Sequence, residues 1–118
     1  MIYVKINGTL YPAVIVGKMT DKDWDNRESK SITLEMTYAE AIELFVDGLI
    51  WSIVQREEVP TVDEDGNQIG TETHEAEFDN SDFDIAGSIT DHRNGTITAK
   101  MGKITDGEAL AELMEVMG

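Results

Sequence analysis

The stretch from residue 31 to residue 55 constrains the fold most, because it reads as a strand, a capped helix and a second strand in succession. Apolar and polar residues alternate over 32–36, as they do in a strand with one buried face. Thr37 and Glu40 then form a capping-box pattern, in which each side chain satisfies a backbone N–H group at a helix start. The pattern predicts a short helix over about 37–47.

Apolar spacing predicts which face of this helix is buried. One stripe recurs at helical intervals and should face the core: Tyr38, Ala41, Ile42 and Phe45. Gly48 should end the helix, because glycine tolerates the left-handed conformation found there. Residues 49–55 are apolar at both parities apart from Ser52 and the final Gln55, which predicts a central strand covered on both faces. The residues predicted to pack the core are Ile32, Leu34, Tyr38, Ile42, Phe45, Trp51, Ile53, Leu110 and Leu113.

Hairpin signals surround this segment. Asn7-Gly8 separates an alternating strand over 2–6 from a return strand over about 9–16. Pro12 lacks an N–H donor, so we expect the return strand at an edge or with a bulge. Asn94-Gly95 closes a second hairpin between strands over 83–90 and 96–101, in which Ile89 can face Ile97.

A second capping box opens the last element. Thr105 and Glu108 have the capping-box spacing, and apolar residues follow at helical intervals: Leu110, Leu113, Met114 and Met117. The acids Glu108, Glu112 and Glu115 should mark the solvent side of this helix. The predicted fold class is therefore α+β. We expect a single domain over 1–118 whose mostly antiparallel sheet has about six or seven strands, with two short helices (about 37–47 and 106–117) packed on it.

Charge limits the range of partners. The chain carries 24 acidic against 9 basic residues, a formal net charge of −15. Binding to phosphates needs Lys and Arg, so nucleic acid and anionic membranes are not expected as partners. There is no cysteine, no signal-peptide pattern at the N-terminus and no apolar run long enough to cross a membrane. These features predict a cytoplasmic protein.

A run of alternate acids in the polar segment 17–30 raises the question of a metal site. Asp21, Asp23 and Asp25 resemble the opening of a calcium-binding EF-hand loop, but Asn26 replaces its turn glycine and Ile32 its bidentate Glu. We therefore expect a solvated acidic loop with Trp24 tucked onto the domain, and treat these three aspartates as weak metal candidates. No metal and no cofactor is predicted.

Half of the acids lie over 57–91, where there is no Lys or Arg. Residues 57–79 read as a long exposed hairpin around a turn cluster at 63–67. Such dense like charge indicates either a solvated arm or an arm that docks on a basic surface of a partner. The candidate partner-binding residues are Glu57, Glu58, Asp63, Glu64, Asp65, Glu72, Glu75, Glu77 and Asp79.

Catalytic patterns are weak. His74 and His92 lie on two different predicted hairpins, and neither has zinc-pair spacing. His92 follows Asp91, and Ser81 or Ser88 could serve as nucleophiles, but no nucleophile elbow or phosphate loop accompanies them. We predict a protein that is not an enzyme.

Two long segments carry a resemblance: GKMTDKDWDNRESKSITLEMTYAEAIELFVDGLIWSIVQ and FDNSDFDIAGSITDHRNGTITAKMGKITD. They resemble small uncharacterised proteins encoded in phages and prophages of Gram-positive, largely clostridial, gut bacteria, near tail and baseplate genes. The likeness covers most of the chain, least so around 63–70. It implies a context and no catalytic residue.

This resemblance implies a minor tail or baseplate-associated structural or assembly component that acts through protein contacts. Its partners would be phage tail or baseplate proteins, or further copies of itself. It would be cytoplasmic in the producing bacterium, with incorporation into the virion as a further expectation. The alternative is an acidic phage inhibitor that imitates nucleic acid on a host defence protein. A calcium-stabilised module, based on the aspartate run alone, is a third interpretation.

Overall fold

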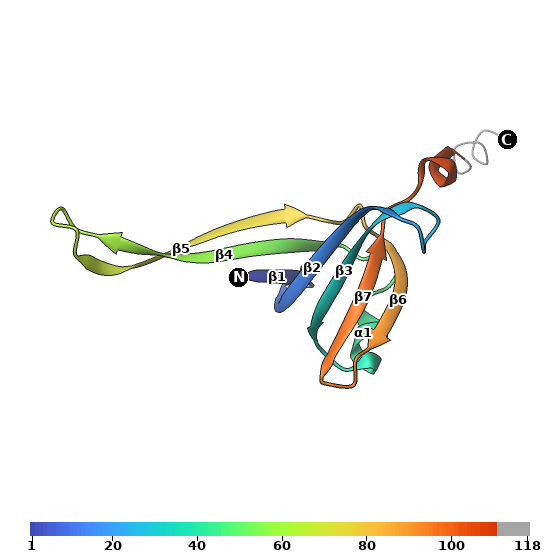
Figure 1. Ribbon diagram of the computed structural model, residues 1–118, viewed down its shortest axis with the longest axis horizontal. Helices are drawn as coiled ribbons and strands as arrows, with labels where there is room; N and C mark the ends of the chain where they lie inside the picture. Colours follow the sequence, from blue (N-terminus) through green and yellow to red (C-terminus); the bar gives the residue numbers. More distant parts are fainter. Residues whose placement is uncertain (111–118) are drawn as a thin grey trace.

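Seven antiparallel strands form one sheet in the order β5-β4-β1-β2-β3-β7-β6 (Figure 1). The computed structural model describes residues 1–110. Its elements are β1 (Ile2–Ile6), β2 (Thr9–Asp21), β3 (Arg27–Glu35), α1 (Tyr38–Leu44), β4 (Trp51–Val62), β5 (Gln68–Asp79), β6 (Ile85–Asp91) and β7 (Thr96–Gly102). A second helix starts at residue 106. The predicted α+β class is confirmed in this coarse form, although the fold is mostly β and its helices are short.

The first hairpin forms at the predicted turn. Asn7 and Gly8 both have positive φ angles, 51° and 80°, as a two-residue turn between β1 and β2 requires. The prediction for Pro12 holds only locally, because β2 is an inner strand of the sheet but Pro12 itself has a paired neighbour on β1 alone. β2 pairs with β1 as far as Pro12 and with β3 from Ala13 onward, so the proline stands where the strand exchanges partners.

The segment 17–30 is a hairpin rather than the predicted solvated loop. β2 runs on to Asp21 and β3 begins at Arg27, so only a short turn separates them. Asp25 and Asn26 take positive φ angles of 55° and 59° in this turn. Polar residues continue along both strands because Asp21, Arg27 and Ser29 are buried at this end of the sheet and hydrogen-bond to other polar groups.

The second predicted hairpin exists with a different register. β6 and β7 flank a four-residue turn in which Arg93 and Gly95 have positive φ angles. Ile89 lies opposite Ala99, and Ile97 lies opposite Asp91, so the expected Ile89–Ile97 pair was wrong. The four-residue turn sets the register from Ile89 to Asp91, and an irregularity between Ala86 and Ile89 shifts only the pairing of the first residues of β6.

α1 covers one face of the sheet near β6 and β7. Thr37 caps it as predicted, its hydroxyl accepting from Glu40 N at 3.1 Å. The helix has only seven residues, ends at Leu44 rather than near 47, and buries Ala41 and Phe45. Tyr38 and Ile42 are 47% and 48% exposed, so their prediction as core residues was wrong. Two turns can present only one row of side chains to the sheet.

The core lies between α1 and the sheet. Ile32, Leu34, Phe45 and Trp51 are buried as predicted, and Ile53 packs partly buried against them. Trp51 donates from Nε1 to the carbonyl oxygen of Phe83 at 2.9 Å. The buried apolar residues of this cluster are Val4, Ile6, Ile32, Leu34, Ala41, Phe45, Leu49, Trp51, Phe83, Ile97, Ala99 and Met101.

The second capping box forms completely. Glu108 N donates to Thr105 Oγ1 at 3.2 Å, and Thr105 N donates to Glu108 Oε1 at 2.9 Å. Leu110 is 58% exposed, so its predicted burial was wrong. The predictions for Leu113, Met114, Met117, Glu112 and Glu115 lie outside the described residues.

A long arm projects from the body. β4 and β5 continue together well past the other strands (Figure 1), giving the molecule extents of 69 × 37 × 26 Å. The radius of gyration is 18.4 Å, whereas a compact chain of this length has about 13–14 Å. In the described residues, no helix is long and apolar enough to cross a membrane.

Candidate interaction surfaces

The predicted acidic hairpin is this arm. β1 accompanies β4 as far as Arg56, whose N–H donates to the Met1 carbonyl oxygen at 2.9 Å. Beyond Arg56, β4 pairs with β5 alone, from Glu57 opposite His74 to Val62 opposite Gln68. Every residue of β5 is exposed. The arm is therefore a two-stranded ribbon with both faces and both edges in solvent.

Five of the nine candidate partner-binding acids have contacts within the molecule. Glu77 accepts from Lys5 at 3.0 Å and Glu75 from Arg56 at 2.9 Å, both near the base of the arm. Asp63 organises the arm's turn, accepting from Asp65 N and Asn67 N at 2.9 Å. Glu72 lies 3.3 Å from His74 Nε2.

Asp79, at the end of β5, is the fifth. The hydroxyl and backbone N–H of Ser81 both donate to its carboxylate, which lowers the pKa of Asp79 from its ordinary value. Asp79 therefore fixes the turn that follows β5. It is a structural residue rather than a free contact.

The other four acids make no ion pair within residues 1–110. Glu57 and Glu58 lie on β4 just past the last contact with β1, and Glu64 and Asp65 lie in the arm's turn. All four are exposed. The unneutralised charge of the arm is thus concentrated beyond its base.

A second polar cluster lies where the weak metal candidates were predicted. Asp21 has no exposed surface, and its Oδ2 lies 2.7 Å from Lys100 Nζ and 2.9 Å from Ser29 Oγ. These bonds, that of Lys100 above all, lower the pKa of Asp21 to about 2 although burial opposes them. The carboxylate is already neutralised by a lysine.

Asp23 and Asp25 are exposed and do not join Asp21 in a carboxylate cage. Asp23 contributes only its backbone N–H, which donates to Asp21 Oδ1 at 3.1 Å. Residues 1–110 contain no group of three His, Cys, Asp or Glu side chains placed to hold a metal ion. The aspartate run therefore forms a capped turn.

Arg27 extends this cluster to the second helix. Its guanidinium, only 4% exposed, donates to both carboxylate oxygens of Glu108 at 2.8 and 3.1 Å and to the Lys103 carbonyl oxygen at 3.1 Å. The Arg27 bonds, together with the Thr105 N–H, lower the pKa of Glu108 to about 2. Glu108 was predicted to mark the solvent side of its helix, and its side chain is 46% exposed as expected, although it also pairs with Arg27.

Trp24 tucks onto the domain as predicted. Its ring lies 4.9 Å from the Arg27 guanidinium carbon and covers two glycines, Gly87 and Gly102. A Cβ atom added at Gly102 would lie 2.6 Å from the Trp24 ring. The glycines therefore leave the space that the indole fills.

The candidate catalytic side chains have separate structural partners. His92 Nε2 bonds to Thr98 Oγ1 at 2.7 Å, and His74 lies beside Glu72 on the arm. Ser81 Oγ bonds to Asp79 and to the Trp51 carbonyl oxygen. In the part of the chain that the structure describes, no hydrogen bond joins a serine to a histidine.

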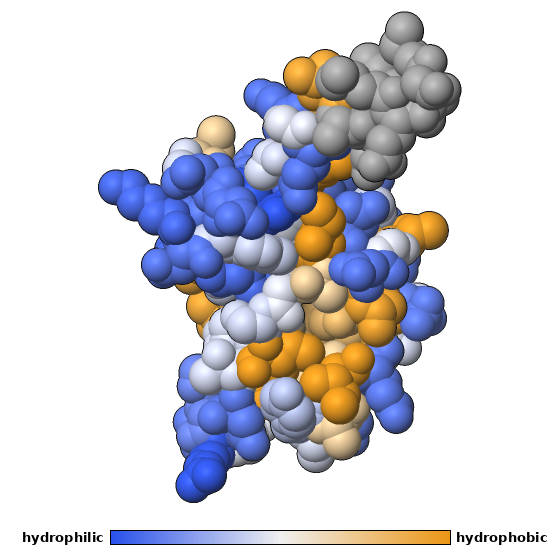
Figure 2. Space-filling view, turned by 90° about the vertical axis from the view of Figure 1, so that its right-hand side faces the viewer, coloured by the Kyte–Doolittle hydropathy of each residue, from blue (hydrophilic) through white to orange (hydrophobic). Residues whose placement is uncertain are grey.

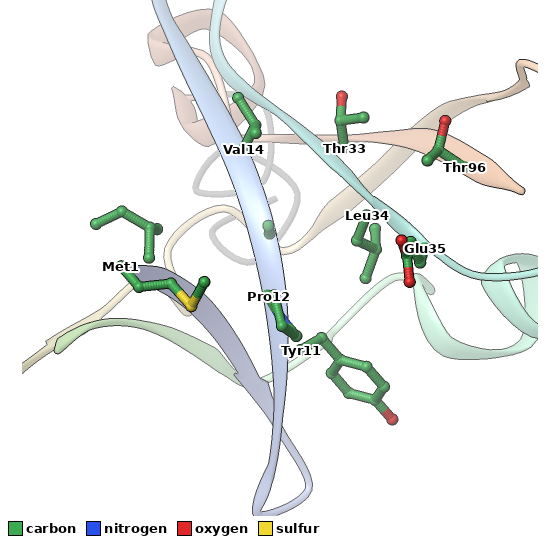
Figure 3. A pocket seen from close by; sticks show the side chains of 10 residues that line it. Met1, Tyr11, Pro12, Val14, Thr33, Leu34, Glu35 and Thr96 are labelled. Atoms are coloured by element: carbon green, nitrogen blue, oxygen red, sulfur yellow. The ribbon is translucent and has the colours of Figure 1, made fainter.

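A groove of about 630 Å³ opens where β2 leaves β1 for β3 (Figure 3). Met1 lies on one side of β2, Thr33 and Thr96 lie on the other, and Val14 projects between them. Apolar side chains also gather on the end of the body that faces away from the arm (Figure 2). Both surfaces are mainly apolar and differ in chemistry from the acidic arm.

Comparison of the chain with protein-family models, with curated protein sequences and with solved structures found no match. The arm is the surface that departs most from an ordinary small domain, both in shape and in charge. We take it as the candidate interaction surface.

Proposed function

We propose that this protein is a non-enzymatic phage or prophage protein, a minor tail or baseplate-associated structural or assembly component. It acts through protein contacts made by the β4–β5 arm. Its partners are tail or baseplate proteins. The phage context comes from the sequence resemblance, and the mode of action comes from the arm.

The observation that carries the proposal is the exposed arm. A two-stranded ribbon is at best marginally stable in water, because it has no third layer against which to bury apolar surface. This arm exposes all of β5, including Ile69 at 68% and Phe78 at 54%. A partner that covers the arm would supply the missing contacts. Such arms suit assembly better than catalysis.

The alternative, an acidic mimic of nucleic acid, has less support. A mimic needs rows of free carboxylates on a stiff surface. Glu75 and Glu77, at alternate positions of β5, are paired with Arg56 and Lys5, which interrupts such a row. In the described residues, the acids of the arm that make no ion pair lie on the two-stranded ribbon beyond the body. A ribbon without a third layer is not the stiff surface that a mimic needs.

Quantitative mass spectrometry on purified particles from the induced prophage, compared with the soluble lysate, tests the proposal. We expect the protein in the particles at a fixed ratio to the tail proteins. Abundant soluble protein with none in the particles would contradict the structural role. Recovery of host nucleic-acid-binding proteins with the soluble form would then favour the inhibitor.

A further inference from the structure

We infer that the free edge of β5 accepts an extended, basic segment of a partner protein as an additional antiparallel or parallel strand. This inference rests on the proposed function, since it specifies how the arm makes its contact.

Two backbone hydrogen bonds establish the direction of the peptide groups in the arm. Asn80 N donates to the Trp51 carbonyl oxygen at 2.9 Å, and Arg56 N donates to Met1 on the opposite side of β4. Peptide groups alternate in direction along a strand. The odd-numbered residues of β4 and the even-numbered residues of β5 therefore bond to each other. The outward-facing positions of β5 are Thr71, Thr73, Glu75 and Glu77.

The same alternation explains how β4 accommodates Pro60. Pro60 lies at an outward-facing position of β4, opposite Thr71, so its missing N–H costs the β4–β5 ladder no hydrogen bond. An incoming strand would find no donor at this point. The β4 edge of the arm is thus blocked by a proline, a common protection of exposed strand edges.

The opposite edge of the sheet is blocked in another way. β6 has only seven residues, and its pairing with β7 is irregular between Ala86 and Ile89. Gly87, in the irregular section, lies against the Trp24 ring. Short length and a bulge both hinder the addition of another strand.

β5 has none of these protections. It is twelve residues long and contains no proline and no lysine, and the one irregularity in its pairing lies at the arm's tip, between Thr61 and Val62. A long, unblocked edge is the usual site of strand addition. Within residues 1–110, β2 also has one unpaired side from Ala13 to Asp21, but that stretch carries Lys18 and an irregularity between Lys18 and Asp21, which are protections that β5 lacks.

Charge selects the kind of strand that can add. The ribbon presents Glu72 on β5 and Glu57 and Glu58 on β4, with no Lys or Arg partner in the described residues. Side chains of an added strand would stand about 4.5–5.5 Å from those of β5. A second copy, with its formal charge of −15, would be repelled. A segment with Lys or Arg at alternate positions would be attracted.

The test uses a synthetic peptide of about twelve residues that alternates lysine with threonine, titrated into the full-length protein. Two control peptides isolate the two parts of the inference. One replaces lysine by glutamate, and the other keeps every lysine but is N-methylated at every residue, so that neither of its edges can donate to a ladder. Fluorescence anisotropy gives the affinities at low and moderate salt.

Two protein variants complete the design. Thr73→Pro removes an outward-facing N–H without touching the bonds to β4, and Thr73→Ala removes the same hydroxyl but keeps the N–H. We expect Thr73→Pro to lower the affinity for the lysine peptide by about tenfold. Thr73→Ala should change this affinity by less than about twofold. Circular dichroism confirms that both variants fold.

Binding of the lysine peptide, with loss on N-methylation and on Thr73→Pro, supports strand addition. Equal binding of the methylated peptide, or none of the lysine peptide, overturns it. Self-association of the protein that strengthens with salt also overturns it, because the occupant would then be a second copy. Particle mass spectrometry tests the proposed function separately, so the failure of one is distinguishable from failure of the other.

Discussion

Asp21 shows how a single buried charge organises one end of the sheet. Its carboxylate accepts from Lys100 and Ser29, and its Oδ1 accepts from the Asp23 N–H in the turn that follows. Lys100 comes from β7 and Ser29 from β3. One side chain thus joins three strands, and removing it would leave the Lys100 ammonium without its partner.

Replacing Asp21 by Asn should therefore destabilise the protein in a pH-dependent manner. The pKa of Asp21 is about 2 in the folded protein against an ordinary value of 3.8. A lowered pKa adds stability above the ordinary value, and this is lost as the pH falls through the folded value. We expect the stability gap between wild type and Asp21→Asn to be constant above about pH 5 and to close towards pH 2. Urea denaturation across this range measures it.

Asp23→Asn is the matched control, since Asp23 is exposed and contributes only its backbone to the cluster. Its stability should follow that of the wild type at every pH. A gap for Asp21→Asn that does not change between pH 7 and pH 2.5 would mean that the Lys100 pair contributes no electrostatic stability.

A second prediction concerns the packing around Gly102. A Cβ atom there would lie 2.6 Å from Trp24 and 2.7 Å from Arg27 Cδ. Gly102→Ala should cost about 1–3 kcal/mol by overpacking. Gly17→Ala is the control, because a Cβ at Gly17 has open space around it and should change the free energy of unfolding by less than about 0.5 kcal/mol. Equal denaturation midpoints would contradict the packing described.

Local sequence patterns predicted the structural roles of some residues and missed those of others. Thr37, Thr105 and Asn7-Gly8 act through neighbours a few positions away, so their roles could be predicted from the sequence. Asp21 and Arg27 could not, because Lys100 and Glu108 come from the other end of the chain. The three aspartates read as a solvated run, and only tertiary pairing buries the first of them.

At the scale of elements, β4 has two roles. Its first residues are core, with Trp51 2% exposed, and its last residues form the arm. The predicted central position of this strand is confirmed, because β4 lies between β5 and β1. The change from core to arm occurs at Arg56, beyond which β4 no longer pairs with β1.

Trp51→Ala tests the placement of β4. Removing a buried indole and its bond to Phe83 should cost about 3–5 kcal/mol in a denaturant titration. Ile50→Ala is the neighbouring control, since Ile50 is 78% exposed and its loss should cost less than about 1 kcal/mol. A loss below about 1 kcal/mol for Trp51→Ala would be incompatible with a buried position.

Elements were easier to predict than their registers. Every predicted hairpin is present, since turn residues and alternation are local signals. The pairing of Ile89 with Ala99 follows from the four-residue turn over 92–95, whereas Asn94-Gly95 alone signals a two-residue turn. The burial of individual helix residues could not be predicted either, because Tyr38 and Ile42 fit the apolar stripe and are nevertheless exposed.

At the scale of the molecule, charge and shape are combined in the arm. The base of the arm is neutralised by Lys5 and Arg56, whereas its outer part is acidic and open along β5. The exposed acidic hairpin could be predicted from composition. The difference between its two edges could not be predicted. It depends on whether the backbone at Pro60 faces β5 or solvent, and the strand pairing sets that direction.

Both proposals require the arm to stand free of the body in solution, and small-angle X-ray scattering of the monomer measures this most directly. The structure has a radius of gyration of 18.4 Å and a longest dimension of 69 Å. We expect a measured radius of about 18–20 Å, with a pair-distance distribution that tails towards the full length. A radius of about 14 Å with a symmetric distribution would mean that the arm folds against the body and its β5 edge is not available.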